Sequence, residues 1–185
     1  MARLPYLDRS DLAPEHQNLL DRPINLFRAL VHSPDGARGW SAIGHYIRFG
    51  SKLDARLREL AILQVGYVTR SPYEFSHHVK IGRDFGLSDN DIRAIAAETE
   101  GRATDLDPLA KTVLKAAREM TANLAISDAT FAGLREKLGN ERLTDLVLTI
   151  AFYNAVVRIL ATMQIDVEDE YLPYLKQFPL PSAPG

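Results

Sequence analysis

Two neighbouring stretches decide the fold, and they read Asp54-Ala-Arg-Leu-Arg-Glu-Leu-Ala-Ile-Leu-Gln-Val-Gly-Tyr-Val68 and Ser71-Pro-Tyr-Glu-Phe-Ser-His-His78. Asp54 belongs to the residue types that cap helices, and the apolar residues after it indicate a helix with a broad buried face. Ser71, Pro72 and Glu74 have the spacing of a capping box with proline in the first turn. A second helix is therefore expected to begin at Ser71, and a hairpin of the two helices would bring Glu59 to its start.

Helical signals continue through the rest of the chain. Apolar spacing and capping residues predict further helices over 14–20, 24–31, 36–49, 88 onward, 107–125, 127–138 and 140–165. Glycine stands where several of them should end, at Gly50, Gly86 and Gly139. No hairpin dipeptide separates two alternating apolar runs, so strands are not expected. The sequence predicts a compact all-α, multi-helix bundle.

The chain has the length of one domain, 185 residues. We expect a single domain over residues 1–185, with a core at about 25–165 and a helical extension before it. The tail after Asp166 contains four prolines, which favour an extended segment on the surface. These are Pro173, Pro179, Pro181 and Pro184.

Composition excludes several classes of function. The formal net charge of -2 argues against a nucleic-acid-binding domain. The chain has no cysteine, which excludes disulfides, thiolate metal sites and thiol redox chemistry. The longest uncharged apolar stretch, 146–157, is too short to span a membrane, and the first residues do not resemble a secretory signal. We expect a cytoplasmic protein without a nucleic-acid or membrane partner.

Carboxylates near histidines are the candidates for chemistry. Glu74 lies three and four residues before His77 and His78, so on a helix it can reach either imidazole. A carboxylate in that position makes an imidazole a general acid or base. Burial of Glu59 among apolar neighbours is expected to raise its pKa and make it a proton carrier.

A structural interpretation of the same carboxylates stands beside the catalytic one. Glu74 can simply cap its helix, and Glu59 can pair with Arg56 or Arg58 on a solvated face. Both interpretations agree with the sequence.

The remaining histidines give weaker signals. His16 and His32 lie among charges near helix ends and are expected to be solvated, whereas His45 is expected to be buried. The step from Glu74 to His77 matches the Glu-x-x-His spacing of di-iron bundles, but the sequence has no second such step. We therefore expect no metal site and no cofactor.

Several segments taken together carry a family resemblance: Asn25-Leu-Phe-Arg-Ala-Leu, Trp40, residues 53–65, Tyr73-Glu-Phe-Ser-His-His78 and Gly86-Leu-Ser-Asp, with a weaker similarity at 145–158. They resemble the carboxymuconolactone decarboxylase family, whose superfamily includes the alkylhydroperoxidase D proteins. The resemblance implies an all-α fold with a shared pocket.

The peroxidase branch of this family carries a glutamate, a Cys-x-x-Cys and a histidine. Glu59 and His78 stand at the glutamate and histidine positions, and Ser71 and Glu74 stand at the two cysteine positions. Serine cannot form the sulfenate or disulfide that hydroperoxide reduction needs. The sequence is therefore more similar to the decarboxylase branch than to the peroxidases.

The resemblance implies an acid/base enzyme acting on a small carboxylated lactone or another intermediate of aromatic catabolism. His78 would donate the proton, Glu74 would orient it, and Glu59 would hold or relay a proton. One alternative is a non-catalytic binding or assembly protein on the same scaffold, and a redox role is the third.

Substrate binding is expected at the start of the same helix. Arg70 or Tyr73 would hold the substrate carboxylate, helped by the positive helix N-terminus, and Ser71 and His77 would belong to the same site.

Self-association is also expected. The segment 143–163 is apolar on nearly every side, and Trp40, Tyr46 and Phe49 add aromatic surface. Such an excess of apolar surface usually closes against a symmetry mate. The family resemblance also implies self-association. We therefore expect a homo-oligomer, which would be a dimer, trimer or hexamer. The alternative is that this helix is the central one of a compact bundle.

Overall fold

The computed structural model describes residues 2–182, and within that range it contains helices and no strand. The all-α prediction is confirmed. The helices are α1 (Asn25–Leu30), α2 (Pro34–His45), α3 (Ala55–Val68), α4 (Pro72–Asp84), α5 (Asp89–Thr99), α6 (Pro108–Asn123), α7 (Asp128–Met163) and α8 (Leu172–Gln177). Short 3-10 helices occupy Arg9–Asp11, Pro14–Leu20 and Asp169–Tyr171, and a π-helical turn covers Tyr46–Gly50.

Helix α3 lies at the centre because most of its surface is apolar. Every residue from Leu57 to Tyr67 is buried, and α4, α6 and α7 pack around it. Asp54 caps α3 as predicted, since its carboxylate accepts a hydrogen bond from the Leu57 N–H at 3.0 Å. Gly66 allows α4 to approach closely, because a Cβ there would lie 3.2 Å from the backbone nitrogen of Phe75. The predicted hairpin of α3 and α4 is thereby formed.

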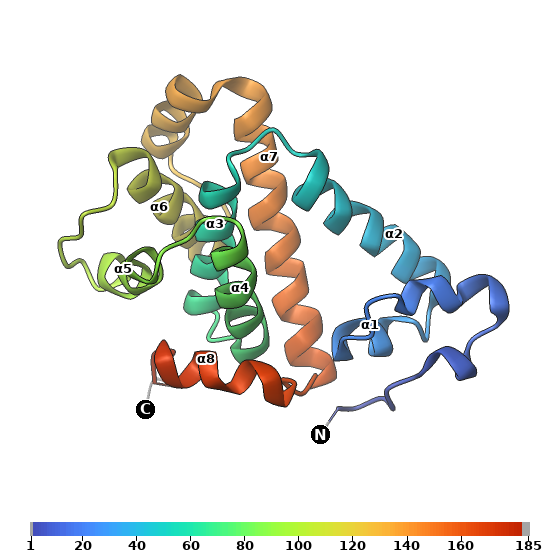
Figure 1. Cartoon of the computed structure of the whole chain (residues 1–185). Helices are drawn as coiled ribbons and strands as arrows, with labels where there is room; N and C mark the ends of the chain where they lie inside the picture. Colours follow the sequence, from blue (N-terminus) through green and yellow to red (C-terminus); the bar gives the residue numbers. More distant parts are fainter. Residues whose placement is uncertain (1, 183–185) are drawn as a thin grey trace.

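Helix α7 runs through the middle of the molecule, between α1 and α2 on one side and α3 to α6 on the other (Figure 1). Gly139, with φ 72° and ψ 174°, interrupts it at the predicted boundary between two helices. Among the described residues, α7 alone has the length and hydropathy that a membrane span needs. It packs against α3 and α6, and it buries Asp145, so its contacts are those of a core helix.

Asp145 ties α7 to the segment that follows the π-helical turn. Its carboxylate accepts hydrogen bonds from the hydroxyl groups of Tyr46 at 2.7 Å and Ser51 at 2.9 Å, and from the Lys52 N–H at 2.7 Å. Burial raises the pKa of Asp145, but these donors outweigh burial and hold that pKa below its ordinary value. The buried carboxylate is therefore fully satisfied.

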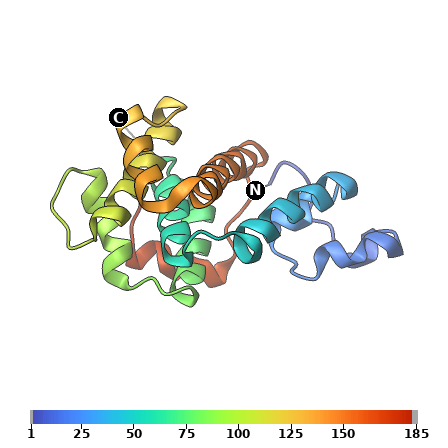
Figure 2. The same ribbon diagram turned by 90° about the horizontal axis from the view of Figure 1, so that it is seen from above.

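Residues 2–50, here called the arm, lie beside the main core (Figure 2). The arm has a small apolar cluster of its own, formed by Leu12, Leu20, Val31 and Ala37. His45 is exposed on α2, so the prediction that it is buried is wrong. Its ring lies 5.0 Å from that of Phe49, and it faces the open space of a cavity instead of the packed core.

The prediction of an extended tail after Asp166 is wrong for residues 169–177, which are helical. A 3-10 turn and α8 follow, and α8 packs on α4. Tyr171 and Phe178 are buried there, and their apolar rings account for the compact arrangement. Pro173 lies in the first turn of α8, where proline fits a helix. Pro184 lies outside the described residues.

Candidate functional site

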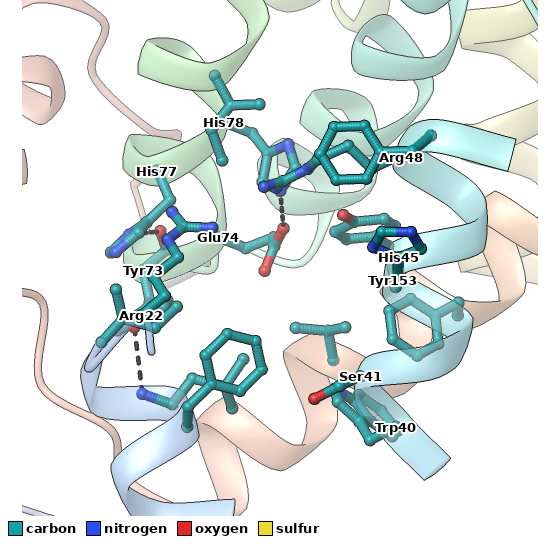
Figure 3. Close-up of a pocket in the computed structure, with 18 residues that line it drawn as sticks. Arg22, Trp40, Ser41, His45, Arg48, Tyr73, Glu74, His77, His78 and Tyr153 are labelled. Atoms are coloured by element: carbon teal, nitrogen blue, oxygen red, sulfur yellow. Dashed lines mark hydrogen bonds and ion pairs between the residues drawn. The ribbon is translucent and has the colours of Figure 1, made fainter. Parts of the chain in front are cut away.

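A cavity of about 300 Å³ lies between the arm and helices α4 and α7. Its apolar walls come from Ile24, Leu26, Phe27, Trp40, Phe49, Ile81, Phe152 and Val156. Its polar groups are Arg22, Ser41, His45, Arg48, Tyr73, Glu74, His77, His78 and Tyr153. Figure 3 shows the Glu74 carboxylate facing the open space, with Tyr73 and His77 on one side and His45 and Tyr153 on the other. A mostly apolar cavity with a few convergent polar groups is typical of a small-molecule site.

His78 lies between two carboxylates. Its Nδ1 is 2.7 Å from Oε2 of Glu59, and its Nε2 is 3.0 Å from Oε1 of Glu74. All three side chains are buried. The hairpin delivers Glu59 from α3, and the four-residue step along α4 delivers Glu74, so the structure brings together the three residues predicted to be catalytic. Their catalytic roles stay a prediction.

A buried arginine extends this cluster. Nε of Arg58 donates to Oε1 of Glu59 at 3.0 Å, and its guanidinium lies 4.5 Å from the centre of the Phe85 ring. Arg58, Glu59, His78 and Glu74 thus alternate in charge when the imidazole is protonated. In such a chain of charges, the attraction between neighbours of opposite sign offsets the free energy that desolvation of each charge costs. The structural interpretation of the sequence included a pair between Glu59 and Arg58. The pair forms, but it lies in the core rather than on a solvated face.

The cluster sets the proton affinity of His78. Burial lowers the pKa of His78, but the negative charges of Glu59 and Glu74 outweigh burial and raise the pKa to about 9. The imidazole therefore carries two protons at neutral pH. Tyr153 packs edge-on against the ring at 4.9 Å, and burial together with the two carboxylates raises the pKa of its hydroxyl.

The prediction of a raised pKa for Glu59 is wrong. Burial does raise the pKa of Glu59, but the charges and hydrogen bonds of His78 and Arg58 outweigh it and lower the pKa below its ordinary value. Glu59 is therefore an ionised acceptor that fixes the imidazole, and it does not line the cavity.

His77 belongs to a second cluster on the same helix. Its ring stacks between those of Tyr73, at 4.0 Å, and Tyr171, at 3.6 Å. Its Nδ1 donates to the carbonyl oxygen of Tyr73 at 2.8 Å, and its Nε2 lies 3.1 Å from Oε2 of Glu168. Glu168 also accepts from the Tyr73 hydroxyl at 3.0 Å and from the Asn25 N–H at 2.7 Å. These contacts join the arm, α4 and the C-terminal segment at the edge of the cavity.

Ser71 and Arg70 do not line the cavity at His78. Ser71 is the N-cap residue of α4, as predicted, but within residues 2–182 its side chain makes no capping hydrogen bond. The predicted capping box does not form, because the Glu74 carboxylate turns to His78 instead. Arg70 is exposed, and both residues line a different cavity. The structure therefore does not bring them to His78, whereas Tyr73 and His77 do line the cavity.

Sequence reasoning missed two cations at this cavity. Arg22 comes from the arm and Arg48 from the π-helical turn, and both line the cavity without a carboxylate partner in the described part of the chain. Figure 3 shows Arg22 on the side of His77 and Arg48 on the side of His78. Neither arginine belongs to the capping or carboxylate–histidine motifs that the sequence analysis used. Arg22 is distant in the sequence from both helices of the hairpin, so the hairpin motifs give no signal for it.

Comparisons with known proteins agree with this fold. The sequence model of the carboxymuconolactone decarboxylase family matches residues 34–119, a stretch that includes Glu59, Glu74 and His78 but not Arg22 or Glu168. No curated protein matches the sequence.

Several solved structures share the fold. A peroxidase-related protein with an alkylhydroperoxidase AhpD core from Ralstonia eutropha JMP134 superposes with a TM-score of 0.79 at 20% identity, over 97% of this chain and 98% of that one. A peroxidase-related protein from Silicibacter sp. TM1040 gives 0.71 at 20% identity, over 91% and 92%. A variant of the debrominase Bmp8 in complex with 2,3,4-tribromopyrrole gives 0.79 at 18% identity, over 96% and 100%. Residues 34–119 thus match the carboxymuconolactone decarboxylase family, and the chain has the fold of the AhpD-core protein.

Proposed function

We propose that the protein is an acid/base enzyme that decarboxylates, or moves a proton on, a small carboxylated lactone or a related ring acid. The observation that carries the proposal is a buried imidazole held between Glu59 and Glu74 at the wall of a cavity. The same cavity is lined by two arginines, Arg22 and Arg48, that have no carboxylate partner among residues 2–182. The proposal needs no cofactor.

The proton comes from the cluster around His78. With a pKa of about 9, the ring holds a proton on Nε2 at neutral pH, 3.0 Å from the Glu74 carboxylate. Glu74 lines the cavity and accepts no hydrogen bond from the described chain other than this ion-pair contact. Glu74 is therefore placed to pass a proton between Nε2 and a substrate carbon, while Glu59 holds the imidazole in place. This differs from the sequence prediction, in which Glu74 only orients the imidazole.

The substrate is held by charge at its acidic group and by apolar contact along its ring. Arg22 and Arg48 offer planar guanidinium groups that suit a carboxylate, and neither is neutralised by an acidic neighbour among residues 2–182. Trp40 and Phe152, whose ring centres are 4.5 Å apart and whose planes are tilted by 40°, form an aromatic wall for the ring of the substrate. Arg22 and Arg48 thus take the role of binding the carboxylate that the sequence analysis gave to Arg70.

The proposed reaction has two steps, loss of CO₂ and protonation of the ring carbon. The bond between the ring carbon and the carboxylate breaks, CO₂ leaves, and the electron pair stays on the lactone as a dienolate. The positive charges at the cavity stabilise the dienolate oxygen. Glu74 delivers the proton from Nε2 of His78 to the ring carbon, and solvent returns a proton to the imidazole.

The test uses a panel of lactone carboxylates and aromatic carboxylates, assayed for CO₂ release and for exchange of substrate hydrogen with deuterated water. With an accepted substrate, His78→Gln and Glu74→Gln should each lower kcat by about 100-fold or more, the range of general acid/base catalysis. His32→Gln is the matched control, because that exposed ring lies outside the cavity and should leave kcat unchanged. Undiminished turnover in both folded variants would contradict the proposal.

A binding protein on the same scaffold is the second candidate, because a charge-balanced ion chain also stabilises a fold without any reaction. It is favoured if a panel compound binds with the affinity of a substrate, shows neither CO₂ release nor hydrogen exchange, and binds equally well to His78→Gln. A thiol peroxidase is excluded by the absence of cysteine. Purified protein should therefore give no hydroperoxide turnover with a dithiol donor above the reaction without enzyme.

The proposal includes a cytoplasmic location and a homo-oligomeric state, with no nucleic-acid or membrane partner. The cavity lies against the arm, whose apolar side chains are partly exposed, so association is expected to affect it.

A further inference from the structure

A second cavity, of about 450 Å³, lies where α4 begins and α7 ends. Figure 1 shows these two helix ends at the same end of the molecule. The ring of Tyr73 is part of the wall of both cavities, but no other residue is shared. The function proposed above makes no use of this second space.

Positive charge gathers at this cavity. Arg70 and Arg158 line it, and its lining among the described residues includes no aspartate or glutamate. Nη1 of Arg158 donates to the carbonyl oxygen and to Oδ1 of Asn154, at 2.5 and 3.1 Å, which are neutral acceptors on its own helix. Among residues 2–182 neither guanidinium has an acidic partner, so the cavity attracts an anion.

A serine at the same wall has a hydroxyl without a hydrogen-bond partner in the described chain. Ser71 is 8% exposed, and its side chain makes no hydrogen bond within the described chain. The first-turn amides of the 13-residue α4 are thus left without the acceptor that a serine N-cap normally supplies. Buried polar groups are usually satisfied, by protein, water or ligand. An oxyanion at this position would accept from Ser71 and the amides together, at the positive end of α4.

The rest of the wall is apolar. Val157 and Leu160 of α7 and Ile165 just beyond it face the same space. We propose that this cavity is a second binding site, for a small organic carboxylate whose charged group lies at Ser71 and Arg70 and whose apolar body lies on α7. This site does not depend on the function proposed for the His78 cavity.

The experiment titrates the full-length protein with benzoate and, separately, with inorganic phosphate, and follows both cavities by NMR. The backbone amides of Ser71 and Gln164 report on the second cavity, and the indole N–H of Trp40 reports on the first. Benzoate should produce saturable shifts at Ser71 and Gln164. Arg70→Ala and Arg158→Ala should each weaken this binding about tenfold or more, as loss of a charge-assisted hydrogen bond would.

Two controls separate the cavities. Arg142→Ala removes the same charge from an exposed position on α7 outside both cavities, and Arg22→Ala removes a cation from the first cavity. Both should leave the response of Ser71 intact. The proposal is overturned if benzoate gives no saturable response at Ser71, if Arg70→Ala and Arg158→Ala bind it unchanged, or if Arg22→Ala abolishes the response. Phosphate binding as tight as benzoate binding would also contradict it, because the apolar wall would then contribute nothing.

Discussion

Helices α3 and α2 have similar lengths but opposite surroundings. Every residue of α3 from Leu57 to Tyr67 is buried, including the charged Arg58 and Glu59, whereas α2 buries only Ala37. Helices α4, α5, α6 and α7 enclose α3, so its buried charges must pair with neighbouring charges. Several apolar side chains of α2 and the following turn are exposed, with Ile43 at 49% and Phe49 at 66%. The difference teaches that enclosed charges such as Arg58 and Glu59 are paired in the core, whereas the arm exposes an apolar face.

The largest expected effect concerns that face. We predict that the wild-type protein associates, with a mass in light scattering of at least twice 20.6 kDa at micromolar concentration. Ile43→Glu, which puts a charge on the exposed face of α2, should shift the mass toward 20.6 kDa. Phe131→Glu is the matched control, because Phe131 is also an exposed apolar residue but lies on the first part of α7.

A wild-type protein that stays at the mass of one chain contradicts association. Dissociation by Phe131→Glu and not by Ile43→Glu would place the interface away from the arm.

The second prediction compares the loss of unfolding free energy when a buried carboxylate and an exposed carboxylate are removed. Glu59→Ala leaves Arg58 and His78 buried without their shared carboxylate, and should lower the free energy of unfolding by about 3–5 kcal/mol. Asp21→Ala removes the partner of Arg9 in an exposed ion pair of the arm, and should cost less than about 1 kcal/mol. Urea unfolding of both variants measures the difference. Equal costs would show that the core cluster is not the stabilising network described above.

The smallest effect is the pH dependence of stability. The pKa of His78 in the folded protein, about 9, lies above its ordinary value of 6.5, so the bound proton stabilises the fold fully below pH 6.5. That contribution is lost as the pH rises through 9, with a slope of up to about 1.4 kcal/mol per pH unit. Unfolding measured between pH 6.5 and 9.5 should show this loss in the wild type and in Asp21→Ala, but not in His78→Gln. A wild-type stability that rises over this range would contradict the assignment.

Local sequence signals predicted what depends on neighbours along the chain. The cap at Asp54, the break at Gly139 and the four-residue step from Glu74 to His78 are short-range features, and the structure has all three. The capping box at Ser88 and Asp91 forms as well, with reciprocal hydrogen bonds of 2.9 and 3.1 Å. The helical hairpin and the three residues around His78 could therefore be predicted from one stretch of sequence.

Long-range contacts could not be predicted in this way. Glu168 meets His77 from the other end of the chain, and Arg22 reaches the cavity from the arm, without any periodic signal that links these segments. The error in the pKa of Glu59 has the same origin. Burial was visible in the apolar neighbours of Glu59, but the opposing charges of His78 and Arg58 become decisive only when the packing brings them within 3.0 Å.

The central claim is that His78 is a protonated imidazole held between two carboxylates, and ¹⁵N NMR of histidine-labelled protein tests it most directly. The spectrum is followed from pH 5 to 10, with the His78 signals assigned by their absence in His78→Gln. The account predicts that both ring nitrogens of His78 carry protons at pH 7 and that the ring titrates with a pKa near 9. A neutral ring at pH 7, with a titration midpoint at or below 6.5, would contradict it.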